Sequence, residues 1–186
     1  MKAIACIDTN LGIAKDNKLL FHIDHDMRRF KHLTTAGGVV LMGYNTFKND
    51  MKFRPLPNRI NIVITSTIEN EKNYPGVTIV KSVEEAMELV TLYESLGKEV
   101  FLIGGRKVYE SFLKYCTEIY ITLVDAQVQA DTWFPASFSE YSEEYECMID
   151  RDETLWCRVN KKLEFYTDNK TNFKYSFLKY KRCILK

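Results

Sequence analysis

Asp26 is a carboxylate on an otherwise apolar helical stripe. In a helix, Asp26, Phe30 and Leu33 share one face because their spacing is i, i+4 and i+7. A carboxylate on an apolar face must be paired, protonated or put to use, because removing its hydration is costly. The pattern therefore predicts either an acidic functional group or a partner for a distant buried arginine or backbone group.

The acidic and histidine side chains around Asp26 are expected to have structural or surface roles. Asp24 is placed to cap the start of the helix and to pair with Arg28 one turn on. His22, His25 and His32 lie nearby, but no pair has the His-x3-His spacing that puts two ligands on one helical face. We therefore expect solvated histidines and no metal site.

Two glycine-containing segments follow expected strands and could approach a ligand closely. Gly104-Gly105 follows the apolar run Val100–Ile103 and precedes a helical pattern, so helix N–H groups could meet a phosphate there. A tight turn would equally explain two glycines. In the segment Gly43-Tyr44-Asn45-Thr46-Phe47, Thr46 is placed to cap a helix or to bind phosphate.

The segment Arg54-Pro55-Leu56-Pro57-Asn58-Arg59 forms a rigid turn before an apolar run. Its prolines restrict the backbone, so a guanidinium there can be held in one place to take a carboxylate in fork geometry. The alternative is an exposed arginine that makes no specific contact.

Short apolar runs alternate with helical patterns, which indicates an α/β layered domain. The expected strands are Ala3–Ile7, Gly38–Met42, Ile60–Thr65, Val77–Val80, Val100–Ile103 and Ile119–Leu123. The expected helices are Asp24 to about Leu33, a helix that Ser82 caps with Glu85 at capping-box spacing, and Lys107–Leu113.

The C-terminal part of the chain has a different pattern. Tyr145–Ile149 and Tyr175–Tyr180 alternate like paired antiparallel strands, separated by a polar stretch. We therefore predict one domain over residues 1–186, with a mixed, mainly parallel β-sheet flanked by helices and an antiparallel C-terminal edge.

Composition excludes several classes of protein. The 186 residues carry a net charge of +1, which gives no reason to expect nucleic acid or an anionic membrane as partner. The five cysteines are widely spaced and never in a CxxC pair, which argues against a disulfide framework and a zinc site. No signal-length or membrane-length apolar stretch occurs, so a reduced, cytoplasmic protein is expected.

Taken in order, these segments resemble dihydrofolate reductase from Ile4 to about Pro135. The matching pieces are Gly12-Ile13-Ala14 with Leu19-Leu20-Phe21, Asp26 with Phe30-Lys31, Met42-Gly43 with Thr46-Phe47, Arg54-Pro55-Leu56-Pro57 with Arg59, Ile103-Gly104-Gly105 with Val108-Tyr109, and Asp131-Thr132 with Phe134-Pro135. Each piece alone is weak, but six in order are specific. Tyr175–Tyr180 is similar to the family's closing strand.

The resemblance implies NADPH-dependent reduction of 7,8-dihydrofolate by a monomer, with residues at about 38–88 forming an adenosine-binding subregion. The implied catalytic residues are Asp26, Thr122 and Phe21. The implied substrate residues are Ile4, Ala5, Met27, Phe30, Leu56, Arg59 and Ile103, with Arg59 holding the glutamate tail. The implied cofactor residues are Ala5, Ile13, Ala14, Gly43, Tyr44, Asn45, Thr46, Thr65, Ser66, Lys81, Ile103, Gly104, Gly105, Arg106, Lys107, Val108 and Tyr109, with Gly104-Gly105 as the family's cis peptide pair.

Four departures from the family pattern modify these expectations. Leu20-Phe21 replaces a Pro-Trp pair, which predicts a more mobile loop. Ala14 replaces a glycine near the nicotinamide, and two extra residues between Phe47 and Arg54 alter one wall of the cleft. Tyr44 and Asn45 replace basic residues, which predicts a smaller preference for NADPH over NADH.

Two other functions are compatible with parts of the pattern. The reductase domain of riboflavin biosynthesis shares the architecture, but it would not need the Arg59 anchor or the Asp26–Phe30 face. A non-catalytic dinucleotide-binding module would lack a desolvated acid in its cleft.

Overall fold

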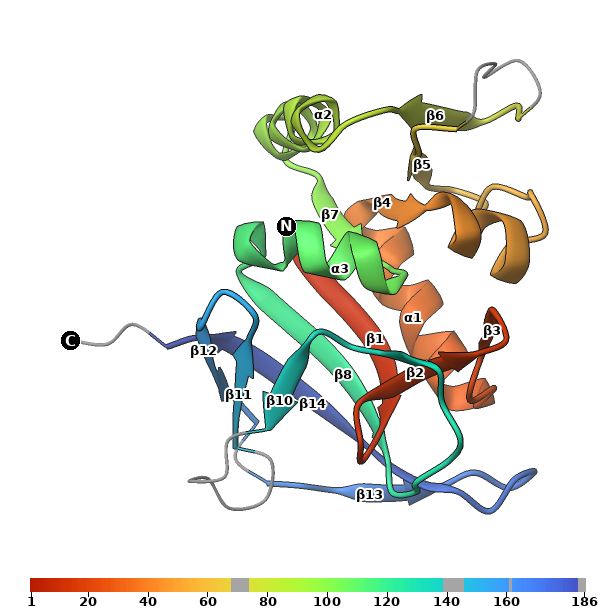
Figure 1. Cartoon of the computed structure of the whole chain (residues 1–186), viewed down its shortest axis with the longest axis vertical. Coiled ribbons are helices and arrows are strands. Elements are labelled where there is room, and N and C mark those ends of the chain that lie inside the picture. The colour runs from red at the N-terminus through yellow and green to blue at the C-terminus, as the bar shows by residue number, and fades with distance from the viewer. Residues whose placement is uncertain (68–73, 139–145, 161, 184–186) are drawn as a thin grey trace.

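The computed structural model describes residues 1–67, 74–138, 146–160 and 162–183. Figure 1 shows the elements of these ranges. Helical segments are α1 (Asp24–Gly37), η1 (Thr46–Asp50, a π-helical turn), α2 (Val83–Ser95), α3 (Arg106–Phe112) and η3 (Leu113–Tyr115). Strands are β1 (Lys2–Asp8), β2 (Gly12–Lys15), β3 (Lys18–Leu19), β4 (Gly38–Gly43), β5 (Ile60–Ile64), β6 (Val77–Val80), β7 (Glu99–Leu102), β8 (Glu118–Val124), β9 (Thr132–Trp133), β10 (Ala136–Phe138), β11 (Cys147–Asp150), β12 (Leu155–Arg158), β13 (Phe165–Thr167) and β14 (Lys174–Arg182).

The large sheet is mixed, as the sequence predicts. Its strand order is β10-β11-β12-β14-β8-β1-β7-β4-β5-β6, with β13 paired to β14. The pairs from β8 to β6 are parallel, and those from β14 to β10 are antiparallel. The antiparallel edge lies at the opposite end of the sheet from β5 and β6 (Figure 1).

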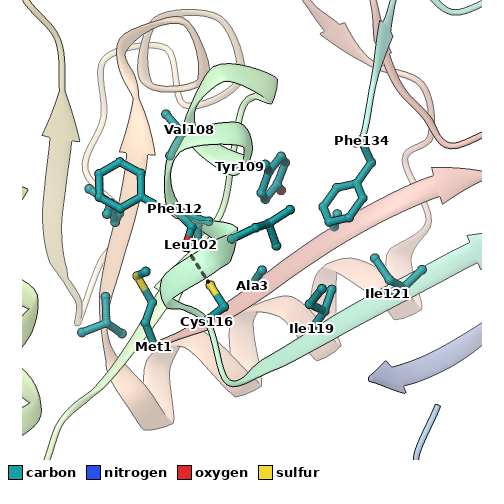
Figure 2. Packing of buried hydrophobic residues seen from close by; sticks show 14 of the residues in the cluster. Met1, Ala3, Leu102, Val108, Tyr109, Phe112, Cys116, Ile119, Ile121 and Phe134 are labelled. Carbon is teal, nitrogen blue, oxygen red and sulfur yellow. Dashed lines mark hydrogen bonds between the residues drawn. The ribbon is translucent and has the colours of Figure 1, made fainter. Parts of the chain in front are cut away.

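Strand β1 separates two layers of core because its side chains alternate between faces. Ala3 and Ile7 pack in one cluster with side chains of α2 and α3, whereas Ile4 packs in another with Phe30 of α1. Figure 2 shows the first cluster, in which α3 residues lie over β1 and β8. Burial on both faces accounts for the near-continuous apolar runs of the central strands.

The C-terminal half contains elements that the sequence did not reveal. The two strands expected to pair there do not pair directly, because β12 lies between β11 and β14. Asp150 forms the turn before β12, where its carboxylate accepts hydrogen bonds from Thr154 N at 2.9 Å and Trp156 Nε1 at 2.9 Å. Tyr145, at the start of the predicted strand, lies outside the described residues.

The expectation of an entirely reduced chain is wrong in this structure. Cys157 and Cys183 form a disulfide, with their Cα atoms 5.6 Å apart. Antiparallel pairing of β12 with β14 brings these two distant residues together, and their sequence spacing carries no sign of it. Among the described residues, no helix is long and apolar enough to cross a lipid bilayer, and no group of three or more His, Cys, Asp or Glu side chains is placed to hold a metal ion.

Glu118 is surrounded by cations where β8 lies beside β1 and β14. Its carboxylate lies 2.9 Å from Lys179 Nζ and 3.3 Å from Lys181 Nζ, and it accepts a 2.9 Å hydrogen bond from the Tyr120 hydroxyl. Burial opposes ionisation, but hydrogen bonds from these three groups prevail and lower the pKa of Glu118 to about 2. The ionised carboxylate therefore stabilises the folded state.

Replacing Glu118 with Gln should reduce stability in a pH-dependent way. The folded-state pKa is below the usual value of about 4.3, so the contribution is full above that pH and is lost as pH falls toward 2. We expect Glu118→Gln to lower the free energy of unfolding by about 1 kcal/mol at pH 7 and by less at pH 3. Urea denaturation at both pH values measures this, with Glu88→Gln on the exposed face of α2 as control. An equal loss at both pH values would contradict the assignment.

Candidate active site

A cavity of about 640 Å³ runs along the ends of the central parallel strands, between α1 on one side and α3 on the other. Most of the residues predicted from the sequence line it: Ile4, Ala5, Ile13, Ala14, Asp26, Met27, Phe30, Gly43, Tyr44, Asn45, Thr46, Thr65, Ser66, Ile103, Gly104, Gly105, Arg106, Lys107, Val108 and Tyr109. The cavity therefore brings together segments that are scattered over more than a hundred positions of the chain.

Asp26 lies in the first turn of α1 and faces this cavity. The Thr122 hydroxyl of β8 donates a 2.5 Å hydrogen bond to Asp26 Oδ1. Burial raises the pKa of Asp26, while the Thr122 hydrogen bond and the charge of Arg29 oppose that shift. Thr122 itself is fully buried and is the register partner of Cys6 on β1. The predicted pairing of Asp26 with Thr122 is thus present in the structure.

Asp24 does not have the local role expected for it. Ile23 occupies the N-cap position of α1 without a side-chain cap. The Asp24 carboxylate lies 2.6 Å from Lys170 Nζ and 4.0 Å from His22 Nε2, so its ion pair is with a distant residue rather than with Arg28. This pairing, led by the hydrogen bond with Lys170, lowers the pKa of Asp24.

His25 is not the solvated residue that the sequence suggested. Its Nδ1 lies 2.9 Å from the Tyr175 hydroxyl, and its ring meets Phe177 edge-on at a centroid distance of 4.9 Å. Tyr175 and Phe177 belong to β14, and the Tyr166 ring of β13 also meets the His25 ring, so these two C-terminal strands pack beside the start of α1. His22 and His32 are exposed, as expected.

The opposite wall of the cavity is formed by glycines in close backbone contact. The Gly104-Gly105 peptide is cis, as expected, and Gly43 N–H donates a 2.8 Å hydrogen bond to the Gly104 carbonyl. A Cβ on Gly43 would lie 2.9 Å from Val108 Cγ2, so a side chain there would force Val108 on α3 to shift. Gly104 has a φ of +101°, which disfavours other residues. Thr46 begins η1, and the N-cap position belongs to Asn45 without a side-chain cap.

Arg59 is fixed by its own turn and by α1. Its Nη1 donates to Thr34 Oγ1 at 2.9 Å, and its Nε donates to the Pro57 carbonyl at 3.1 Å. The buried side chain of Asn61 closes the turn, because it accepts from Leu56 N and donates to the Leu56 and Arg59 carbonyls. Thr34 follows Asp26 by eight residues, so the contact of Arg59 with α1 is made about 12 Å along the helix axis from the acid.

Besides Thr122, four of the predicted site residues do not line the cavity. Leu56 and Arg59 belong to the turn just described, and Lys81 lies beyond β6. Phe21 is buried and meets the Phe173 ring edge-on at 5.3 Å, in a cluster that also holds Cys6.

The cavity also contains residues that were not among the predicted site residues: Cys6, Asn17, Lys18, Leu19, Asn49, Asp50, Met51, Ile64, Thr67, Ser111, Phe112 and Thr132. Asp50 ends η1, and burial raises its pKa to about 6. It lies in the segment between Phe47 and Arg54, where the sequence resemblance indicates two extra residues. That insertion was the available signal, but its direction toward the cavity could not be derived from the sequence.

Known proteins share both the sequence and the arrangement. The dihydrofolate reductase family profile matches residues 1–182. The chain is 32% identical to dihydrofolate reductase of Bacillus subtilis over 179 residues, covering 96% of this chain and 92% of the relative. It is 34% identical to the Staphylococcus aureus enzyme over 128 residues, which covers 69% of this chain and 73% of the relative.

The similarity extends to three dimensions. A solved structure of dihydrofolate reductase from Enterococcus faecalis, complexed with NADP(H) and RAB-propyl, superposes with a TM-score of 0.76 at 28% identity. The superposed region covers 98% of this chain and 96% of the Enterococcus faecalis chain. The whole-length profile match, the relatives and the shared fold lead to one conclusion: this chain belongs to the dihydrofolate reductase family.

Proposed function

We propose that this chain reduces 7,8-dihydrofolate to 5,6,7,8-tetrahydrofolate with NADPH in the cavity between α1 and α3. The observation that supports the site most strongly is the pairing of Asp26 with Thr122 inside a cavity whose other wall is the Gly104-Gly105 turn. This arrangement would suit a flat substrate ring stacked on a flat cofactor ring, because the acid can bind the substrate ring while the glycine backbone lies against the cofactor ring. The riboflavin-pathway reductase and the binding module remain less suited, because neither needs this acid.

Asp26 would bind the 2-amino group and N3 side of the pteridine. Bound NADPH supplies the hydride, from nicotinamide C4 to pteridine C6. An anionic carboxylate in a desolvated pocket favours the positive charge that develops on the pteridine ring. N5 lies on the other side of the ring from the groups that Asp26 binds, so we infer that its proton arrives through water.

The glycine wall fits a dinucleotide. Gly43 and Gly104 line the cavity without side chains, since a Cβ at Gly43 would meet Val108 and one at Gly104 would meet the Tyr109 ring at 3.1 Å. Ile13 and Ala14 face the same space from β2. These residues would position the nicotinamide, and Tyr44, Asn45, Thr65 and Ser66 would lie toward the adenosine end.

Arg59 would hold the α-carboxylate of the glutamate tail. Two of its N–H groups are engaged by Thr34 and Pro57, which fixes the guanidinium and leaves its other donors for a ligand. The distance of about 12 Å from Asp26 along α1 is one that a p-aminobenzoyl unit can span. We also propose that the chain acts as a cytoplasmic monomer, and its balanced charge gives no reason to expect nucleic-acid partners.

Replacing Asp26 with Asn should lower kcat/KM for dihydrofolate by about two to four decades at neutral pH, the usual scale for an acid–base group. Part of the activity should return at low pH, where the substrate brings its own proton. Loss of absorbance at the nicotinamide band measures the rate, with a reaction lacking dihydrofolate as blank. Asp24→Asn is the matched control, since Asp24 pairs with Lys170 outside the cavity. Greater damage from the Asp24 change would refute the assignment.

Replacing Arg59 with Met should raise KM for dihydrofolate far more than it lowers kcat. Losing a charge-assisted fork to a carboxylate costs about 2–3 kcal/mol of affinity. A rise in KM with little change in kcat is expected when the lost interaction stabilises the bound substrate and the transition state equally. A dihydropterin without glutamate should be indifferent to the change, and Arg54→Met, on an exposed residue of the same turn, should leave both substrates unaffected. The role would be excluded by equal losses for the two substrates.

Replacing Tyr44 with Arg should increase the preference for NADPH over NADH. One charge-assisted contact to the 2′-phosphate, screened by solvent, is worth roughly 0.5–1.5 kcal/mol, or about a two- to twelve-fold gain in the ratio of kcat/KM values. The gain should shrink at high salt. A parent ratio already in the thousands and unmoved by the substitution would show that other residues hold the phosphate.

A further inference from the structure

Arg29 directs its charged head group into the protein, beside the proposed acid. It lies one helical turn after Asp26 on α1, and it is half-buried. The centre of its guanidinium lies 4.4 Å from the centroid of the Phe177 ring on β14 and 5.6 Å from that of Tyr120 on β8. Aromatic faces on two adjacent strands therefore hold the cation in place.

The guanidinium and the carboxylate share one hydroxyl group. Arg29 Nη1 donates to Thr122 Oγ1 over 3.4 Å, and Thr122 Oγ1 donates to Asp26 Oδ1 over 2.5 Å. A guanidinium has donors and no acceptor, so the Thr122 hydroxyl must accept from Arg29. Its single hydrogen is then directed to Asp26. This arrangement favours the ionised carboxylate, which accepts that hydrogen, over the neutral acid.

The charge of Arg29 acts in the same direction as this hydrogen bond. Through the shared hydroxyl, its Nη1 lies within about 6 Å of Asp26 Oδ1, a separation at which an opposite charge stabilises a carboxylate. The other titratable groups that act electrostatically on or with Asp26 are His25 of α1, Cys6 of β1, Tyr109 of α3 and Tyr175 of β14. Among these described groups, Arg29 is the one that is permanently charged.

We propose that Arg29 is a positioning residue for Asp26, which acts through the Thr122 hydroxyl to keep the carboxylate ionised and oriented toward the substrate cavity. The proposal deepens the assignment of Asp26 as the acid of the reductase site, and it rests on that assignment. Arg28, the adjacent residue on α1, is exposed and provides a matched control.

The decisive experiment titrates Asp26 in the ligand-free protein by carboxyl ¹³C NMR, with Asp26→Asn to assign the signal. Arg29→Met should raise the pKa of Asp26 by about one pH unit, the lower end of the effect of a nearby opposite charge. Arg28→Met should change it much less, and Arg29→Lys, which restores the charge, should recover most of the parent value. If Arg29→Met destabilises the fold, Arg29→Gln keeps a donor without the charge and should give the same rise.

The steady-state profile supplies a second readout. The pH at which kcat/KM for dihydrofolate changes with Asp26 ionisation should move upward by the same amount in Arg29→Met and not in Arg28→Met. A titration of Asp26 that is the same in the Arg29 and Arg28 variants would overturn the proposal. If the titration shifts but the parent protein does not oxidise NADPH with dihydrofolate, the positioning role stands and the proposed function fails.

Discussion

A largely buried carboxylate has to be compensated for its lost hydration, and the arrangement around Asp26 follows from that constraint. Its partner Thr122 comes from β8, almost a hundred residues later in the chain. The contact can form only if β8 lies next to β1 and α1 crosses the same face. The parallel β1–β8 pairing, which runs in register from Lys2 to Asp8, supplies that placement. The pairing of β8 with β1 is therefore what allows Thr122 to reach Asp26.

The second wall of the site depends on the absence of side chains rather than on their presence. Gly43 ends β4, and Gly104 follows β7, its parallel neighbour, so their backbones approach closely enough for a hydrogen bond of 2.8 Å. Tyr109 closes the space behind them, and its hydroxyl donates to the Ile4 carbonyl of β1 at 2.7 Å. Two hydrogen bonds at the cavity thus involve backbone groups at the ends of β4 and β7 and within their neighbour β1.

Local patterns in the sequence were sufficient for the features that depend on neighbouring residues. The helical phase of Asp26 with Phe30 predicted which acid faces the cavity, and the apolar runs predicted the central strands. Thr122 and the cis Gly104-Gly105 bond came from the resemblance rather than from any pattern. Features set by long-range antiparallel pairing were missed: β12 inside a polar stretch, the Cys157–Cys183 disulfide and the aromatic surroundings of His25. Arg29 was missed as well, because the alternative left open for Asp26 was a distant buried arginine and Arg29 is only three residues away.

We expect the edge of the substrate pteridine to bind Asp26 while the nicotinamide lies against the Gly104-Gly105 turn. A crystal structure of this chain with NADP⁺ and folate would test this placement. It should show Asp26 carboxylate oxygens at hydrogen-bond distance, about 2.7–3.0 Å, from the pteridine 2-amino group and N3, with the glutamate α-carboxylate at Arg59. A pteridine bound elsewhere, or one whose 2-amino edge turns away from Asp26, would contradict it.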